Sequence, residues 1–224
     1  MSKCLVVNTE ILRGLPFWSR MRKIEGKISA ALPLLKEEIA QLIETIENNK
    51  VFKERFGENG VENDPTWQQI GLYGILLQER GMVFVYQRAN DNNYSDKRLR
   101  AKLSIGVGGH MEPCDGTLMD SLLREISEET YLSMEGVPYT VSDKDVKITG
   151  VIKYERDLVG EVHFGLVCPI YLDSRIEISL KGKENIRSWI IPLDEYNSFV
   201  SSNGLIPESW ADLVMENAEK LGIK

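Results

Sequence analysis

The sequence lacks the features that mark membrane, secreted and disulfide-rich proteins. No apolar run approaches the roughly 18 residues that a membrane span needs, and the apolar stretch after Met1 is too short for a secretory signal. The three cysteines, Cys4, Cys114 and Cys168, are widely spaced and form no CxxC pair. Neither a disulfide framework nor a structural zinc site is therefore indicated. Together these absences predict a cytoplasmic protein.

Positively charged residues are fewer than negatively charged ones. The 27 Lys and Arg residues are outnumbered by 34 Asp and Glu residues, which gives a formal net charge of −7 and a pI near 5.1. A chain with this balance does not bind nucleic acid or an anionic membrane through its overall charge. We therefore expect a small-molecule partner, no nucleic-acid partner and no membrane association.

What the chain does contain is an ordinary globular composition. Its 224 residues are 42% hydrophobic and 27% charged, which suits one large domain or one domain with an extension. A turn-rich acidic segment at residues 57–65 is a candidate junction. It predicts an N-terminal extension at residues 1–68 and a main domain at residues 69–224. Within the extension, apolar residues from Leu32 to Ile46 recur at helical spacing and predict an amphipathic helix.

Strand-like and helical patterns alternate irregularly in the main domain. Apolar runs at residues 72–77 and 82–86 are separated by a short turn and predict a β-hairpin, while residues 117–132 have a helical pattern. Further strand-like runs lie at residues 103–107, 146–154, 162–172, 176–180 and 188–191, and further helical ones at 194–201 and 209–221. Such irregular alternation, with hairpins, favours a mixed sheet covered by helices. The expected fold class is α/β (α+β).

Three glutamates share one side of the helix predicted at residues 117–132. At roughly 100° per residue, Glu125, Glu128 and Glu129 fall on one arc beside the apolar stripe. Glu125 and Glu129 are a like-charge pair that costs about 0.2–0.5 kcal/mol, and the C-terminal half of a helix disfavours anions. A divalent cation would reverse both costs. Carboxylates without His or Cys partners suit Mg²⁺ or Mn²⁺; the alternative is a solvated acidic face.

The segment from Gly109 to Leu132 resembles the Nudix box, whose usual form is G-x5-E-x7-R-E-U-x-E-E-x-G-U with U aliphatic. Its most specific part is matched in full by the run 124–129, Arg-Glu-Ile-Ser-Glu-Glu. Three features depart from the pattern. Asp115 stands where Glu is usual, the spacer to the arginine is one residue longer, and Tyr131 replaces the closing glycine.

The resemblance covers residues 69 to about 205, and the run from Leu103 to His110 is similar to a subgroup of longer bacterial members. It implies a Nudix-like α/β/α sandwich with a mixed β-sheet, plus an N-terminal, partly helical extension at residues 1–68. It also implies a Nudix-type pyrophosphohydrolase that uses Mg²⁺ (or Mn²⁺) to cleave a phosphoanhydride bond in a nucleoside diphosphate linked to another group. The extension could serve as a dimer arm in a homodimer or as a specificity lid.

The same resemblance implies roles for individual residues. Glu128 and Glu129 would be the main metal ligands, with the Gly108 carbonyl near them. Glu125 would be a further ligand or the base that activates water, and Arg124 would orient the glutamates through ion pairs. The expected catalytic residues are therefore Arg124, Glu125 and Glu129.

Three charged residues outside the box are further candidates for the substrate site. Glu184 occupies a region where some Nudix members place another acidic residue, and its simple alternative is an exposed loop charge. Arg98 and Arg100 belong to a basic cluster that could clamp the distal phosphate of a substrate, and their alternative is a solvated loop.

Two other functions stay open at this point. One is a non-catalytic Nudix-like domain that binds a nucleotide and regulates another process. The other is an isopentenyl diphosphate isomerase-type enzyme, for which no clear catalytic Cys and Glu pair is visible. The substrate is also open, since nucleoside triphosphates, ADP-ribose, dinucleoside polyphosphates, sugar nucleotides and coenzyme A all contain the required bond.

Overall fold

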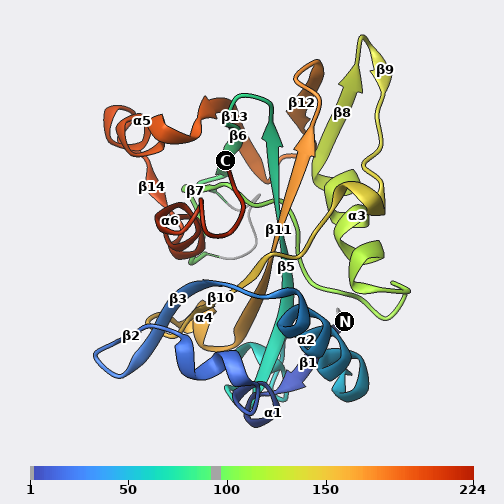
Figure 1. The fold of residues 1–224 in the computed structure, drawn as a ribbon, viewed down its shortest axis with the longest axis vertical. Coiled ribbons are helices and arrows are strands. Elements are labelled where there is room, and N and C mark those ends of the chain that lie inside the picture. Colours follow the sequence, from blue (N-terminus) through green and yellow to red (C-terminus); the bar gives the residue numbers. More distant parts are fainter. Residues whose placement is uncertain (1–2, 92–96) are drawn as a thin grey trace.

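The centre of the molecule is formed by two long parallel strands. The computed structural model describes residues 3–91 and 97–224 (Figure 1). β5 (Trp67–Gln78) and β11 (His163–Leu172) pair in parallel along ten consecutive residue pairs. Nearly every residue of both strands is buried, as expected for strands covered on two faces.

The remaining strands extend this centre in both directions. On one side of β5 lie β6 (Met82–Arg88), β7 (Lys102–Ser104) and β14 (Ile206–Pro207), with β13 (Asn185–Pro192) paired to β6. Beyond β11 lie β10 (Gly150–Tyr154), β3 (Lys27–Pro33) and β2 (Lys23–Ile24). β1 (Lys3–Asn8) pairs with β5 and with β4 (Val51–Glu54). A second, small sheet contains β12 (Ile176–Leu180), β8 (Thr130–Met134) and β9 (Val137–Pro138).

Helices cover the large sheet on two faces. α2 (Lys36–Asn49) and α3 (Leu118–Glu129) pack on one face, together with Leu72 and Leu76 of β5. α5 (Tyr196–Ser202) and α6 (Ser209–Glu216) pack on the other face, where Tyr73, Ile75 and Leu77 point. Figure 1 shows α3 and the pair α5 and α6 on opposite sides of the central strands. Two short helices are α1 (Thr9–Arg13) and α4 (Leu158–Glu161). The α/β/α sandwich with a mixed sheet confirms the predicted fold class.

Three predicted helices are shorter than expected. The one predicted at residues 209–221 ends at Glu216, and the other two give way to strands. The helix predicted from Leu32 begins only at Lys36, because residues 27–33 form β3 and pair with β10. The helix predicted to reach residue 132 ends at Glu129, because Thr130–Met134 pairs with β12. In both places strand pairing with a distant segment outweighs the local helical pattern.

Residues 1–68 contribute strands to the main sheet. β1 pairs with β5, and the Leu5 N–H donates to the Met111 carbonyl oxygen at 2.9 Å. The predicted boundary between residues 68 and 69 falls inside β5, which begins at Trp67. The division of the chain at this point stays a prediction. In the described part of the chain, no helix has the length and apolar character required to cross a membrane.

Candidate active site

α3 carries four of the eight predicted site residues, and its sequence fixes both where it begins and how it is rotated. The Thr117 hydroxyl accepts from the Asp120 N–H at 3.1 Å and caps the helix, which is worth about 1 kcal/mol. Leu118, Leu122 and Ile126 are buried in the core, and each such side chain contributes about 1.5–3 kcal/mol. This burial outweighs the repulsion among the glutamates and sets the acidic side of the helix at the edge of the core.

A glycine turn brings backbone close to these carboxylates. Gly108 has a φ of +146°, and a Cβ there would lie 2.2 Å from the Leu72 carbonyl oxygen. A Cβ on Gly109 would lie 2.5 Å from the Glu125 Oε1 atom, while the Leu72 N–H donates to the Gly109 carbonyl at 3.0 Å. Only glycine fits at position 108, and a side chain at position 109 would displace the Glu125 carboxylate. The turn therefore packs directly between β5 and α3.

Arg124 connects the loop before α3 to two of its glutamates. Its Nε and Nη2 atoms donate to the two carboxylate oxygens of Asp115, both at 2.9 Å. Its Nη1 atom donates to Glu125 at 3.1 Å and to Glu128 at 3.2 Å. Hydrogen bonds from the guanidinium lower the pKa of Asp115. Because a bidentate pair has a defined geometry, Asp115 holds Arg124 in place, and Arg124 in turn holds Glu125.

The three glutamates of α3 lie in different environments. The side chain of Glu128 is 59% exposed, whereas that of Glu125 is 17% exposed. Burial raises the pKa of Glu125; burial also raises the pKa of Glu129 to about 7, and repulsion from Glu125 and Glu184 adds to this. The Oε2 atom of Glu129 is buried without a hydrogen-bond partner. Such an oxygen is costly, and a cation beside it would remove the cost.

The donor atoms present suit a hard divalent cation. Glu125, Glu129 and the Gly108 carbonyl offer only oxygen ligands, and the Gly108 backbone opposes the rise in the pKa of Glu129. Across residues 3–91 and 97–224, no three His, Cys, Asp or Glu side chains already converge as a complete metal site. Mg²⁺ requires only one or two protein carboxylates, since water and phosphate oxygens complete its coordination. The oxygen donors present therefore fit Mg²⁺ or Mn²⁺.

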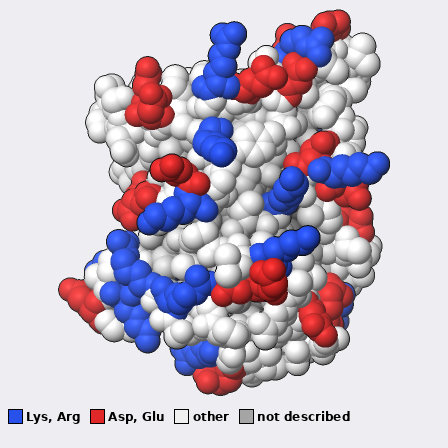
Figure 2. Space-filling model, viewed as in Figure 1, with Lys and Arg blue, Asp and Glu red and all other residues white. Residues whose placement is uncertain are grey.

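A cleft of about 280 Å³ lies beside the glycine turn. Gly108, Glu125 and Glu184 line it, so the structure brings these three predicted residues together. Glu129 lies behind this wall. Lys3 and Arg55, from the N-terminal part of the chain, line the same cleft. Basic and acidic side chains are interspersed on the face shown in Figure 2.

The structure places the two candidate arginines elsewhere. Among the described residues, the cleft wall includes Leu99 but neither Arg98 nor Arg100. The Arg98 guanidinium forms an ion pair with Glu62, whose side chain is 9% exposed and also accepts from Gln69 at 3.0 Å. These contacts give Arg98 a role in joining segments of the fold, and its contact with a substrate stays a prediction.

The sequence did not reveal a buried charge network beside the cleft. Glu208 accepts hydrogen bonds from the Tyr73 hydroxyl at 2.7 Å and the Ser104 hydroxyl at 2.6 Å, and it pairs with Arg88 at 3.0 Å. Arg88 also opposes the rise in the pKa of Glu129. The four residues of this network come from four separate segments of the chain. No local spacing in the sequence could therefore have revealed them.

Comparisons with known proteins bear on the family and the fold of this chain. No family model matches the chain. Protein YmaB from Bacillus subtilis (strain 168) is 30% identical over 165 residues, covering 70% of this chain and 74% of YmaB.

Two solved structures share the fold. Tm1382, a candidate Nudix hydrolase, superposes with a TM-score of 0.67 at 21% identity, covering 99% of this chain and 100% of Tm1382. A bifunctional NMN adenylyltransferase/ADP ribose pyrophosphatase from Francisella tularensis, complexed with AMP and a Mn ion, has a TM-score of 0.50 at 16% identity, covering 69% of this chain and 42% of that chain. The chain therefore belongs to the same family as Protein YmaB, and its resemblance to the Nudix hydrolases extends to the whole fold.

Proposed function

We propose that this protein is a Mg²⁺-dependent Nudix-type pyrophosphohydrolase that cleaves a phosphoanhydride bond in a nucleoside diphosphate linked to another group. The observation that carries the proposal is Glu129, a half-buried glutamate whose Oε2 atom is buried without a partner, whose pKa is raised and which has another glutamate nearby. Folding alone does not favour such a group. A divalent cation beside it would compensate for the burial of this oxygen.

The residues around Glu129 have complementary roles in this proposal. Glu128 and Glu129 would hold the metal together with the Gly108 carbonyl. When bound, the metal would neutralise charge on the diphosphate and make a bound water a better nucleophile. Glu125, which lines the cleft, would be either a further ligand or the base that takes the proton of the attacking water.

Two charged residues would support this chemistry from the rim. Arg124 keeps Glu125 oriented through the 3.1 Å hydrogen bond. Glu184 is an exposed residue that lines the same cleft, where it could add a further ligand. Both assignments follow from position and charge.

A non-catalytic, nucleotide-binding regulatory domain is the second candidate. The observation in its favour is that the described carboxylates are not preassembled as a metal site. Such a protein would bind a nucleotide and show no turnover. The intact set of three glutamates favours the enzyme, because binding alone does not require all of them.

A substrate panel tests the proposal directly. The protein is incubated with Mg²⁺ and nucleoside triphosphates, ADP-ribose, dinucleoside polyphosphates, sugar nucleotides or coenzyme A, and released phosphate, diphosphate or nucleotide is measured. We expect turnover with Mg²⁺ or Mn²⁺ and none in excess chelator. In ¹⁸O-labelled water the label must enter a phosphoryl product. Full turnover in chelator, or label only on carbon, would contradict the mechanism.

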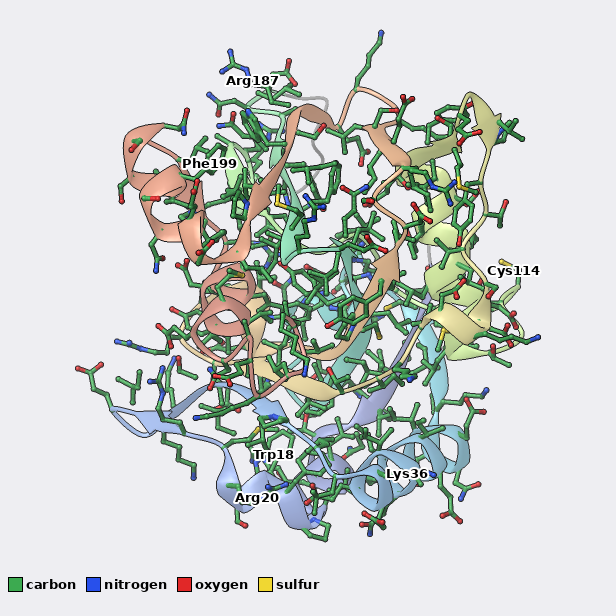
Figure 3. The ribbon with its side chains drawn as sticks, turned by 45° about the horizontal axis from the view of Figure 1, so that its top comes forward. Trp18, Arg20, Lys36, Cys114, Arg187 and Phe199 are labelled. Carbon is green, nitrogen blue, oxygen red and sulfur yellow. The ribbon has the colours of Figure 1, made fainter. Side chains whose placement is uncertain are left out.

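Compartment and assembly complete the proposal. We place the protein in the cytoplasm, which is supported by its three free cysteines; Cys114 lies exposed at the edge of the molecule (Figure 3). A homodimer formed through residues 1–68 is also proposed. Light scattering coupled to size-exclusion chromatography tests it.

A further inference from the structure

We propose that Trp210 is the platform on which the nucleobase of the substrate stacks, and thus the residue that selects base-containing diphosphates. The inference rests on the proposed function, because it places the base of the same substrate whose diphosphate lies at the glutamates. It gives α6 a role in binding the nucleobase, although α6 carries none of the residues expected from the Nudix box.

The Trp210 ring packs against the backbone of two paired glycines. Gly71 of β5 and Gly165 of β11 are directly opposite each other in the parallel pair. A Cβ on Gly165 would lie 2.7 Å from two ring atoms of Trp210, Cη2 and Cζ3, and a Cβ on Gly71 would lie 3.6 Å from Cη2. The indole therefore rests against the main chain of the two central strands. Any larger residue at position 165 would displace it.

A second aromatic ring fixes the orientation of Trp210. Tyr73 meets it edge-on, with ring centroids 5.6 Å apart and an interplanar angle of 81°. The Tyr73 hydroxyl is held by Glu208, which is in turn paired with Arg88. The indole is thus positioned before any ligand arrives. A ring that is already ordered loses little conformational entropy on binding.

Trp210 is only partly buried, and it lines the same cleft as Glu125 and Glu184. The adjoining wall carries hydrogen-bonding groups of the kind that bind sugar hydroxyls, since the Ser209 hydroxyl lies 3.2 Å from the Asp157 carboxylate. An aromatic surface, a hydroxyl–carboxylate pair and the acidic α3 wall therefore share one cleft. The chemistry of these three surfaces matches base, sugar and diphosphate.

Stacking on an indole tolerates every base, because each base has a π-face. We therefore expect Trp210 to distinguish nucleotides from base-free diphosphates, and to discriminate weakly among the bases. A purely structural Trp210, which only covers the glycine pair, would affect both kinds of ligand equally.

The test uses two probes that resist hydrolysis, α,β-methylene-ADP and the base-free methylenediphosphonate, each with Mg²⁺. Intrinsic tryptophan fluorescence and calorimetry are measured on the whole protein. In the parent protein, we expect the nucleotide analogue to quench fluorescence and bind more tightly than methylenediphosphonate. Absence of nucleotide binding would overturn the proposal.

Variants of two tryptophans separate stacking from folding. In Trp210→Leu the affinity for α,β-methylene-ADP should fall at least about 10-fold, while that for methylenediphosphonate should be unchanged. Trp210→Phe should keep the affinity within about threefold and lose the quench. The control is Trp189→Phe, because Trp189 packs on Phe199 at 5.3 Å outside the cleft. It should retain affinity and quench.

The outcomes also distinguish this inference from the proposed function. Equal losses for both probes in Trp210→Leu, or no loss, would overturn the stacking role, and the Phe variant decides the matter if the Leu variant unfolds. If the protein hydrolyses diphosphates but both Trp210 variants bind the two probes as the parent does, only the stacking role of Trp210 is wrong. Stacking on Trp210 with no turnover on any panel substrate defeats the proposed hydrolase and leaves a binding domain.

Discussion

At the level of single residues, two glutamates on helices can be compared: Glu129 is half-buried and Glu44 is exposed. In Glu129→Gln we expect kcat to fall at least about 100-fold, roughly 2.7 kcal/mol of transition-state stabilisation, because the metal loses a charged ligand. Without metal, the free energy of unfolding should stay level or rise, since repulsion from Glu125 is removed. Steady-state kinetics, calorimetric Mg²⁺ titration and urea unfolding in chelator measure these effects.

The matched control is Glu44→Gln on the solvent side of α2. The same loss of charge there should leave turnover, Mg²⁺ affinity and stability unchanged. A Glu129→Gln protein with normal metal affinity and normal turnover would defeat the site assignment. A parent protein that binds nucleotides but has no turnover would support the regulatory alternative.

Lys153 is a second buried charge, and its environment predicts a pH dependence of stability. Its ammonium group donates to Gln68 at 2.6 Å and to the carbonyl oxygens of Gly160 at 2.7 Å and Glu161 at 2.9 Å. Burial lowers the pKa of Lys153 from 10.5 to about 8. Between these two values the unfolded chain binds more protons than the folded protein. The contribution of Lys153 to the free energy of unfolding must therefore rise with pH across this window.

Urea unfolding at pH 7 and pH 10.5 of the parent and of Lys153→Met tests this. The parent should gain up to about 3 kcal/mol relative to the variant between these pH values. At pH 7 the variant should be destabilised by a few kcal/mol, because the carbonyl oxygens lose their donor. Identical pH profiles for the two proteins would show that Lys153 titrates normally.

At the level of elements, Glu62 joins the N-terminal part of the chain to the loop that leads into β7. It belongs to the turn Val61–Asn63, and it pairs with Arg55 at 3.3 Å as well as with Arg98. Removing the charge leaves two arginines around a neutral group. Loss of one partner from a buried ion pair typically costs about 3–5 kcal/mol.

We therefore expect Glu62→Gln to lower the free energy of unfolding by several kcal/mol, measured by urea denaturation. Glu58→Gln, an exposed change nearby in the chain, should have no effect.

Arg98→Met separates the two roles considered for Arg98. A structural role predicts lower stability with KM unchanged, whereas a phosphate clamp predicts a higher KM with stability unchanged.

At the level of the whole molecule, the N-terminal strands complete the sheet and its core. Leu5, Val7, Phe17 and Trp18 belong to the same buried cluster as α3, and Trp18 stacks on Phe164 of β11 at 5.9 Å. Figure 3 shows Trp18 in this N-terminal part of the molecule. A fragment of residues 66–224 would expose the surface that these side chains cover.

We expect that fragment to lack a cooperative thermal transition and native near-ultraviolet circular dichroism, whereas the full chain shows both. Burial of apolar area supplies most of the folding free energy, and a domain's stability is a small difference between large terms. A cooperatively folded fragment with native spectra would instead support an independent domain after residue 68.

The sequence predicted well wherever a regular local pattern decides structure. The hairpin of β5 and β6, the strand β12 and the start of α3 follow from periods of two and 3.6 residues. The end of α3 could not be predicted in the same way. Tyr131 stands where a glycine would mark a helix end, and the pairing with β12 that ends the helix involves residues far along the chain.

The sequence by itself determined the chemistry available to this protein. Arg124 and three glutamates within one helix, preceded by a glycine turn, offer hard oxygen donors in a fixed helical geometry. Only the tertiary structure decided which of them are buried. It turns Glu128 to solvent and Glu129 inward, because the apolar stripe of α3 must face β5. It also decided that Trp210 meets Gly165, since parallel strands and a closing helix bring together residues that share no local pattern.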